Sequence, residues 1–126
     1  MEILNRGKTV LYQSSPSLFQ NICDYRMRSY GRNDVEDFSY NSILDVELLI
    51  IDDLGTEPPS AARYAELLNI LNSRHLNNQS KPCKTIISTN IGAKKLQEYY
   101  TERVMSRIVG GFDRLFFVGE DIRTLK

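Results

Sequence analysis

Apolar residues along this chain gather in short runs that alternate with longer stretches in which they recur at helical spacing. The short runs are rich in aliphatic and β-branched residues and predict strands at Lys8–Gln13, Val46–Asp53 and Lys84–Asn90. The helically spaced stretches predict helices at residues 15–29, 61–77, 93–100 and 101–109, whose apolar faces include Met27, Leu67, Leu71 and Leu76. The strand at Lys84–Asn90 is expected to be buried, and Ser14 or Ser15 with Pro16 is expected to begin the first helix. A last apolar run predicts a strand at Arg114–Val118. Because strands and helices alternate, the pattern predicts a parallel sheet with helices on both faces.

The most informative run is Leu48–Ile51, which is followed at once by Asp52, Asp53 and, after one leucine, Gly55. Four consecutive apolar residues are typical of a central strand buried on both faces. Ligand sites of parallel sheets open at the carboxyl ends of the strands, which is where the two aspartates would lie. Paired carboxylates there suit a divalent cation and an activated water. The same residues also fit an ordinary turn, and this stretch alone leaves both interpretations open.

The strand predicted at 84–90 also ends in polar residues, namely Ser88, Thr89 and Asn90. One interpretation is that Thr89 or Asn90 caps the following helix. The other is that the Asn90 amide lies beside Asp53 and holds a water or a phosphate oxygen. The residues themselves do not decide between these alternatives.

Gly7, Lys8 and Thr9 imitate the end of a phosphate-binding loop, but their surroundings exclude one. Such a loop needs a glycine five positions earlier, a preceding strand and a following helix. Position 2 is Glu2, and the residues that follow predict a strand. The phosphate-gripping element is therefore not found at this place.

Composition narrows the possibilities further. The 126 residues suffice for one domain, and 41% apolar and 25% charged residues are typical of a globular protein. The net charge is zero, so contacts with nucleic acid would have to be local. Basic candidates that also fit ordinary solvated faces are Arg26, Arg28, Arg32, Lys94 and Lys95.

The sequence gives no support for a membrane-spanning segment or for a metal site built from cysteine and histidine. The longest apolar run has four residues, so we expect no membrane partner. Cys23 and Cys83 are far apart and His75 is the single histidine, which gives no metal-ligand spacing. Isolated cysteines and an N-terminus unlike a signal peptide predict a cytoplasmic protein.

Three segments in this order carry a family resemblance: Leu48–Gly55, Ile86–Asn90 and Glu102–Ile108. Together they closely resemble the ATPase domain of bacterial helicase loaders of the DnaC type and of the related IstB-type transposition helpers, both AAA+ proteins. The resemblance runs from about Gly7 to Arg123. It implies a three-layer αβα sandwich with a parallel sheet, of the P-loop NTPase type. Residues 1–126 would form one partial AAA+ domain that begins at the second strand of the family.

The resemblance also implies roles for the polar strand ends. Asp52 would help to hold Mg²⁺, and Asp53, close to the same metal, would orient or deprotonate the attacking water. Asn90 would position that water or touch the γ-phosphate of ATP.

Two arginines acquire implied roles as well. Arg107 matches the arginine finger that reaches the ATP of a neighbouring subunit, with Arg103 as the second choice. Such fingers stabilise charge on the transferred phosphoryl group. Arg123 lies near the place of a lid arginine that contacts nucleotide in some relatives.

One departure from the family pattern is important. The family's first strand and its phosphate loop would precede the first residue of this chain, so the resemblance implies the C-terminal portion of an ATPase domain. ATP and Mg²⁺ would belong to the full-length protein, and this chain alone is expected neither to hold nor to hydrolyse ATP. The missing strand would leave a gap in the sheet, so we expect Leu115–Val118 to pair with Ile86–Thr89 or another chain to fill the gap.

The function that the resemblance implies is the loading of the replicative DNA helicase during initiation of DNA replication. Its partners would be that helicase, single-stranded DNA and further copies of the protein at the face that carries Arg107. The alternatives are a transposition helper ATPase and a non-catalytic, AAA+-derived interaction module. A phosphoacceptor receiver domain is disfavoured, because its acidic pair lies near the chain start and a lysine ends one of its late strands.

Overall fold

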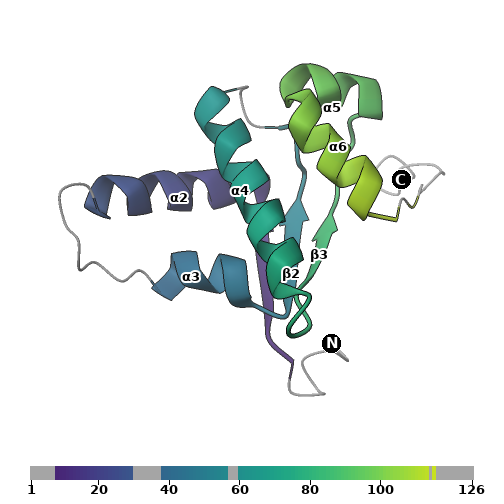
Figure 1. Ribbon diagram of the computed structural model, residues 1–126. Coiled ribbons are helices and arrows are strands. Elements are labelled where there is room, and N and C mark those ends of the chain that lie inside the picture. Colours follow the sequence, from purple (N-terminus) through teal and green to yellow (C-terminus); the bar gives the residue numbers. More distant parts are fainter. Residues whose placement is uncertain (1–7, 30–37, 57–59, 114, 116–126) are drawn as a thin grey trace, which may run out of the picture.

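The computed structural model describes residues 8–29, 38–56, 60–113 and 115. The elements within these ranges follow the predicted order, with one further helix, α3, between the first helix and the acidic strand (Figure 1). They are β1 (Val10–Ser14), α2 (Ser15–Ser29), α3 (Phe38–Asp45), β2 (Leu48–Asp52), α4 (Ala61–Asn77), β3 (Lys84–Ile87), α5 (Ala93–Tyr99) and α6 (Glu102–Gly111). The strand predicted at Arg114–Val118, and with it the predicted closure of a sheet gap, lies outside the described residues apart from Leu115.

The three strands form a parallel sheet in the order β1-β2-β3, with the acidic strand β2 in the centre. Tyr12 is paired in register with Ile50, and Ile50 with Ile86. All three carboxyl ends consequently meet at one edge of the sheet. The predicted parallel arrangement is confirmed, together with the fold class that depends on it.

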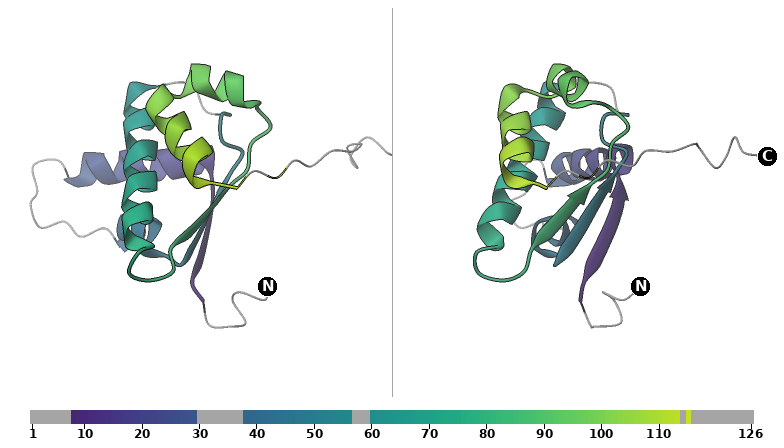
Figure 2. Two further views of the ribbon diagram at one scale, coloured as in Figure 1. Left: turned by 45° about the vertical axis from the view of Figure 1, so that its right-hand side comes forward. Right: turned by 90° about the vertical axis from the view of Figure 1, so that its right-hand side faces the viewer.

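The described helices cover one face of this sheet, as the right-hand view of Figure 2 shows. On the covered face, Leu49 and Ile51 of β2 are fully buried. On the opposite face, Tyr12 is 58% and Ile86 51% exposed, and Ile50 between them is half-buried. The prediction that Ile86 is buried is therefore wrong, because no described helix packs on its side of β3.

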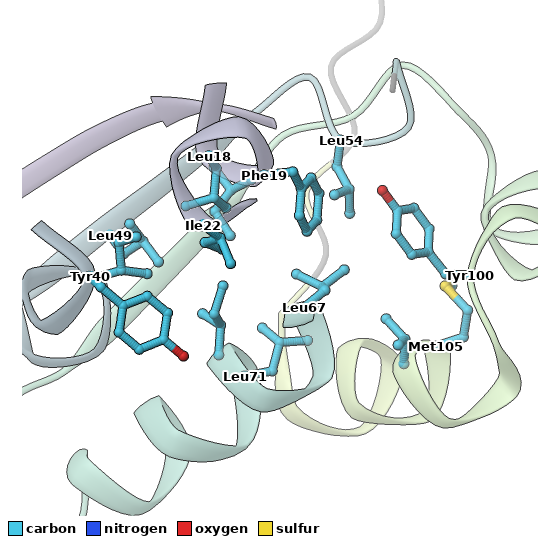
Figure 3. Close-up of a cluster of buried hydrophobic side chains, with 14 residues drawn as sticks. Leu18, Phe19, Ile22, Tyr40, Leu49, Leu54, Leu67, Leu71, Tyr100 and Met105 are labelled. Atoms are coloured by element: carbon cyan, nitrogen blue, oxygen red, sulfur yellow. The ribbon is translucent and has the colours of Figure 1, made fainter. Parts of the chain in front are cut away.

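The apolar core of the described residues lies between the covered face and the helices (Figure 3). Leu67 and Leu71 of α4 belong to it as predicted, and so does Ile70, which sequence spacing missed. Leu76 and Met27, both predicted to be buried, are 63% and 74% exposed. Both lie in the last turns of their helices, beyond the part that packs on the sheet. The other core members include Leu18, Phe19, Ile22, Tyr40, Ile43, Leu54, Tyr100, Val104 and Met105.

Two serines begin helices in the way that such residues usually do. Ser14 Oγ accepts from the backbone N–H of Ser17 at 3.3 Å, and Pro16 occupies the first turn of α2, both as predicted. Ser60 Oγ accepts from the backbone N–H of Arg63 at 3.4 Å and caps α4. The helix that follows each serine is thereby fixed against the carboxyl edge of the sheet.

A buried arginine ties α4 to the amino ends of the strands. The Arg74 side chain is 1% exposed. Its guanidinium donates to the carbonyl oxygens of Ile43, Val46 and Lys84 at 2.9, 2.8 and 2.7 Å, and to Thr85 Oγ1 at 2.8 Å. Burial lowers the pKa of Arg74, against the opposing effects of Cys83 and Asp45. Four acceptors bind the cation, so it joins α3, α4, β3 and the segment that precedes β2 at one point.

Candidate functional site

The candidate site begins with the turn that follows β2. Asp52 is the last residue of β2, and Asp53 adopts a left-handed backbone conformation with a φ of 56°. Gly55 has a φ of 101°, which favours glycine at that position. Leu54, between them, is only 1% exposed and anchors the turn in the core. The chain is thus held by a buried leucine while Asp52 stays half-exposed and Asp53 exposed.

Hydroxyl groups from both neighbouring strands hold the Asp52 carboxylate. The Tyr12 hydroxyl on β1 donates to Oδ2, and the Ser88 hydroxyl just beyond β3 donates to Oδ1. These bonds, first that of Ser88 and then that of Tyr12, lower the pKa of Asp52 below its ordinary value. The bond to Asp52 raises the pKa of Tyr12. Asp52 is therefore a stable anion at neutral pH, with both oxygens oriented.

The acidic turn is also fastened to the end of β3. The backbone N–H of Leu54 donates to the Ser88 carbonyl at 2.9 Å, and the N–H of Ser88 donates to the Ile51 carbonyl at 2.9 Å. The backbone N–H of Asp53 donates to Ser88 Oγ at 3.1 Å, and Thr89 Oγ1 donates to the Leu54 carbonyl at 2.6 Å. The turn that carries the aspartates and the segment that carries Asn90 therefore form one hydrogen-bonded unit.

Asn90 follows Thr89 in a bend and is exposed. Thr89 Oγ1 accepts from the backbone N–H of Ile91 at 3.1 Å, which fixes the bend around Asn90. The Asn90 amide makes no hydrogen bond to another described residue, so its donor and acceptor are available at the carboxyl edge. Of the predicted site residues, Asp52, Asp53 and Asn90 thus lie on segments that the structure brings together.

Two of the predicted arginines, Arg103 and Arg107, lie on helix α6. Val104 and Met105 bury one face of α6, while Arg103 and Arg107 are exposed on the same helix. Within the described residues, Arg107 makes no hydrogen bond or ion pair with either aspartate. Figure 1 shows α5 and α6 on the side of the molecule toward which the strands point. Arg123 lies outside the described residues.

The donor set fits a magnesium ion that is shared with phosphates. Within the described residues, no group of three or more His, Cys, Asp or Glu side chains could enclose a metal by itself. Mg²⁺ is typically held by one or two carboxylates while waters and substrate phosphates fill the remaining positions. Asp52 and Asp53 are hard oxygen donors of that kind. The pair therefore suits a metal that arrives with a nucleotide rather than a structural metal.

The basic residues considered as DNA contacts have different surroundings. The Arg26 guanidinium binds Glu66 at 2.9 Å, donates to the Tyr40 hydroxyl at 2.9 Å and lies 5.0 Å from the centre of the Tyr40 ring. Arg26 is therefore engaged within the fold. Lys94 and Lys95 on α5 are exposed. The Arg28 side chain and Arg32 lie outside the described residues.

Sequence reasoning did not assign Tyr12 or Ser88 to the site. The sequence shows only that Ser88 is a polar residue at a strand end. Its contact with both aspartates depends on the register of β2 with β3. Tyr12 resembles any aromatic residue of a strand, and only the pairing of β1 with β2 brings its hydroxyl to Asp52. A sequence signal for either role exists only once the strand register is known.

Comparison with known proteins identifies a relative of this chain by its sequence. No protein-family model matches the chain. An insertion sequence ATP-binding protein of Sinorhizobium fredii is 30% identical over 122 residues, which are 92% of this chain and 45% of that protein. The chain thus spans about half the length of the curated relative that it matches.

Solved structures give the fold. DnaA of Aquifex aeolicus, bound to the ATP analogue AMPPCP, superimposes with a TM-score of 0.67 at 22% identity, over 88% of this chain and 32% of that one. The DnaC helicase loader superimposes with a TM-score of 0.66 at 22% identity, over 86% of this chain and 60% of that one. A DnaA structure with AMPPCP and single-stranded DNA gives 0.68 at 24% identity, over 87% and 31%.

The chain therefore has the fold of an AAA+ P-loop NTPase domain. Within that class it resembles the DnaC-type and IstB-type ATPases, as its motifs indicated, and the insertion sequence protein is the relative found by sequence. In the described part of the chain, no helix has both the length and the apolar character that crossing a bilayer requires.

Proposed function

We propose that this chain is part of an AAA+ ATPase that loads the replicative DNA helicase at the initiation of DNA replication. In this proposal the longer protein binds and hydrolyses ATP, acts in the cytoplasm, and uses residues 1–126 as the half of its ATPase domain from the second strand onward. The observation that carries the proposal is the hydrogen-bonded unit of Asp52, Asp53 and the segment of Asn90 at the carboxyl edge. The similarity to the DnaC helicase loader supports the biological role.

Each residue of the unit has a separate task in this proposal. Asp52, an oriented anion, holds Mg²⁺ together with the nucleotide phosphates. Asp53 orients the attacking water and accepts its proton. The Asn90 amide contacts that water or the γ-phosphate. When bound, Mg²⁺ would supply positive charge to the phosphate oxygens.

Arg107 serves a neighbouring subunit rather than its own. Its exposure on α6, with no bond to the local aspartates, supports action in trans. An arginine placed at the γ-phosphate of a neighbour stabilises the charge of phosphoryl transfer and raises the rate by about 10³- to 10⁵-fold. Self-association through the face that bears Arg107 is therefore part of the proposal, while Arg123 remains a proposed lid contact.

The first test is the reading frame from which the chain comes. DNA upstream of the Met1 codon should encode a strand followed by Gly-x-x-x-x-Gly-Lys and Thr or Ser. A complete reading frame without that loop would contradict the ATPase proposal and favour the non-catalytic interaction module.

The second test mixes subunits of the protein from the complete reading frame. Arg107→Ala and Asp53→Asn variants should each be inactive alone. A mixture should regain part of the ATP hydrolysis, because some interfaces then pair an intact Arg107 with an intact Asp53. Arg103→Ala is the matched control, since it removes an exposed arginine one turn away and should hydrolyse ATP normally. Full activity of Arg107→Ala alone would contradict the finger role.

The isolated chain provides a third test. We propose that it binds ATP weakly and does not hydrolyse it, because the phosphate-gripping loop is not among its residues. A fluorescence titration with a labelled ATP analogue should show no saturation at micromolar concentrations. Micromolar affinity would contradict the proposal.

Single-stranded DNA is the proposed nucleic-acid partner. It is bound in one of the similar DnaA structures, and the exposed Lys94 and Lys95 on α5 are the contacts that we propose here. Replacing both by alanine should weaken binding of an oligonucleotide to the longer protein and reduce its salt dependence. Replacing Lys81 and Lys84, exposed near the opposite edge, is the matched control.

A transposition helper ATPase is the second candidate, and one observation favours it. The curated relative, at 30% identity, is an insertion sequence ATP-binding protein. The two roles differ in their protein partner, which would be a replicative helicase or a transposase. Stable binding to the helicase and stimulation of its loading on DNA would favour the first role. Stimulation of strand transfer with no binding to the helicase would favour the second.

A further inference from the structure

Ser88 has an unusual set of contacts for a strand-end serine. In the part of the chain that the structure describes, it is the one side chain that is bonded to both aspartates. Its hydroxyl donates to Asp52 Oδ1 and accepts from the backbone N–H of Asp53 at 3.1 Å. An amide N–H can only donate, so the single proton of the hydroxyl is left for the carboxylate.

The Ser88 hydroxyl is not needed to hold the strand in place. The backbone of Ser88 already bonds to Ile51 and Leu54 at 2.9 Å each. An alanine at position 88 would keep both of those bonds. The hydroxyl therefore adds orientation to the two aspartates rather than continuity to the sheet.

Tyr12 completes the arrangement from the other side. Its ring is largely exposed on the uncovered face of the sheet, and its hydroxyl donates to Asp52 Oδ2. Each carboxylate oxygen thus receives one hydrogen bond from a neutral hydroxyl and keeps a lone pair for a cation. Hydroxyls that occupy one side of each oxygen restrict the rotation of the carboxylate about its χ2 angle.

We propose that Ser88 is a positioning residue of the nucleotide site, which orients the Asp52 carboxylate through its proton and the Asp53 backbone through its oxygen, with Tyr12 as a second support for Asp52. The inference rests on the proposed function, in which both aspartates face Mg²⁺ and the phosphates of ATP. The sequence motifs assign only Asp52, Asp53, Asn90 and the arginines to the site. The inference adds Tyr12 from β1 and Ser88 from the end of β3. Support of this kind for metal ligands is typically worth about 10- to 100-fold in metal affinity.

The test uses the 126-residue chain, Mn²⁺ as the probe and nuclear magnetic resonance as the readout. Paramagnetic broadening of the Asp52 and Asp53 amide signals reports the Mn²⁺ concentration that half-fills the site. Hydrogen exchange of the Asp53 amide reports the bond to Ser88. The variants are Ser88→Ala, Ser88→Thr, Tyr12→Phe and the matched control Ser80→Ala, which makes the same change at an exposed serine in the turn after α4.

Ser88→Ala should raise the half-saturating Mn²⁺ concentration about 10-fold. It should also speed exchange of the Asp53 amide about 3- to 10-fold, since one hydrogen bond is lost. Ser88→Thr, which restores the hydroxyl, should return both values to within about twofold of the original. Tyr12→Phe should raise the Mn²⁺ concentration while leaving Asp53 exchange unchanged, and this variant does not depend on Ser88→Ala being folded.

The proposal would be overturned if Ser88→Ala matched the original chain in both measurements, or if Ser80→Ala were equally impaired. It would also be overturned if Ser88→Thr failed to restore either value. Absence of Mn²⁺ broadening at the aspartates of the unaltered chain would instead count against the metal role in the proposed function. In that case, unchanged Asp53 exchange in Ser88→Ala would still reject the role of Ser88.

Discussion

Charged side chains have opposite surroundings at the two edges of the three-stranded sheet. At the amino edge, the Arg74 cation is buried and surrounded by three carbonyl oxygens and one hydroxyl. At the carboxyl edge, the charges of Asp52 and Asp53 remain accessible, and neutral hydroxyls orient the Asp52 carboxylate. The first arrangement surrounds the charge with acceptors of the fold, and the second leaves carboxylate oxygens available to bind a cation.

This difference separates stability from function within one small fold. A buried cation that donates to four acceptors of the fold serves to hold the structure together, and its removal leaves those acceptors unpaired. Exposed carboxylates with oriented lone pairs contribute little to stability but can bind a cation. We therefore expect removal of the charged side chain at the amino edge to change the free energy of unfolding, and removal of the charged side chains at the carboxyl edge to change chemistry.

The largest effect on stability is expected for Arg74→Met. Methionine fills much of the same volume but leaves the carbonyls of Ile43, Val46 and Lys84 without this donor. The free energy of unfolding should fall by about 3 kcal/mol or more, because several buried acceptors lose their partner together. Urea denaturation measures the change, and Arg103→Met, on an exposed site, should stay within about 0.5 kcal/mol. Equal midpoints for the two variants would remove the distinction between the edges.

Leu54→Ala should have the next largest effect. The leucine is fully buried beneath the acidic turn, so its loss creates a cavity next to Phe19 in the core. We expect a loss of about 2–3 kcal/mol in the free energy of unfolding, which is at the lower end for buried leucines because the turn can relax. Thermal unfolding followed by circular dichroism provides the measurement. A change below about 0.5 kcal/mol would show that the carboxyl edge is not anchored in the core.

Asp53→Gly should raise stability while removing a proposed catalytic group. Asp53 has a φ of 56°, a left-handed conformation that costs a non-glycine residue about 1–2 kcal/mol. Glycine avoids that cost but loses more chain entropy on folding, so a net gain of about 0.5 kcal/mol is expected. Denaturation of Asp53→Gly beside Asp53→Asn, which tolerates the same conformation, separates the backbone effect from the loss of charge. Destabilisation by glycine would contradict the strain argument.

The smallest expected effect is the pH dependence that Asp52 introduces. Bonds from Ser88 and Tyr12 lower its pKa in the folded chain, so the folded state favours the ionised form. This contribution is fully present above the pKa of about 3.9 that an unfolded aspartate has, and it is lost as the pH falls through the lower folded value. In Ser88→Ala and Tyr12→Phe the carboxyl-carbon resonance of Asp52 should titrate at higher pH. Identical titration midpoints in the original chain and both variants would show that the hydroxyls do not hold the carboxylate.

The fold was largely predictable because apolar residues recur along the chain at regular strand and helix spacings. Apolar runs at helical and strand spacing predicted all three strands and every described helix except α3, and the acidic ending of Leu48–Ile51 identified the carboxyl edge. Individual burial was harder, as Leu76 and Ile86 show, because it depends on where neighbouring elements end. Arg74 was not predicted at all, since no local pattern reveals that three carbonyls from distant segments converge on one helix position.

The residues of the candidate site also include some that the sequence predicts and some that it does not. Asp52, Asp53 and Asn90 follow strands directly, so chain order alone indicated that they would share an edge. Tyr12 and Ser88 gain their roles from strand register, which a single sequence does not specify. Arg107 depends on a neighbouring subunit in the proposed mechanism, so one copy of the chain neither brings it to the aspartates nor tests its role.

The most direct test of the account is ATP hydrolysis by Asp53→Asn in the protein from the complete reading frame. Asparagine keeps the size of the side chain and tolerates the left-handed backbone, but it cannot accept a proton from water. The account predicts a fall in hydrolysis of at least about 100-fold, with ATP affinity within about threefold of the original. Hydrolysis at the original rate would contradict the assignment of the carboxyl edge as the catalytic half of a nucleotide site.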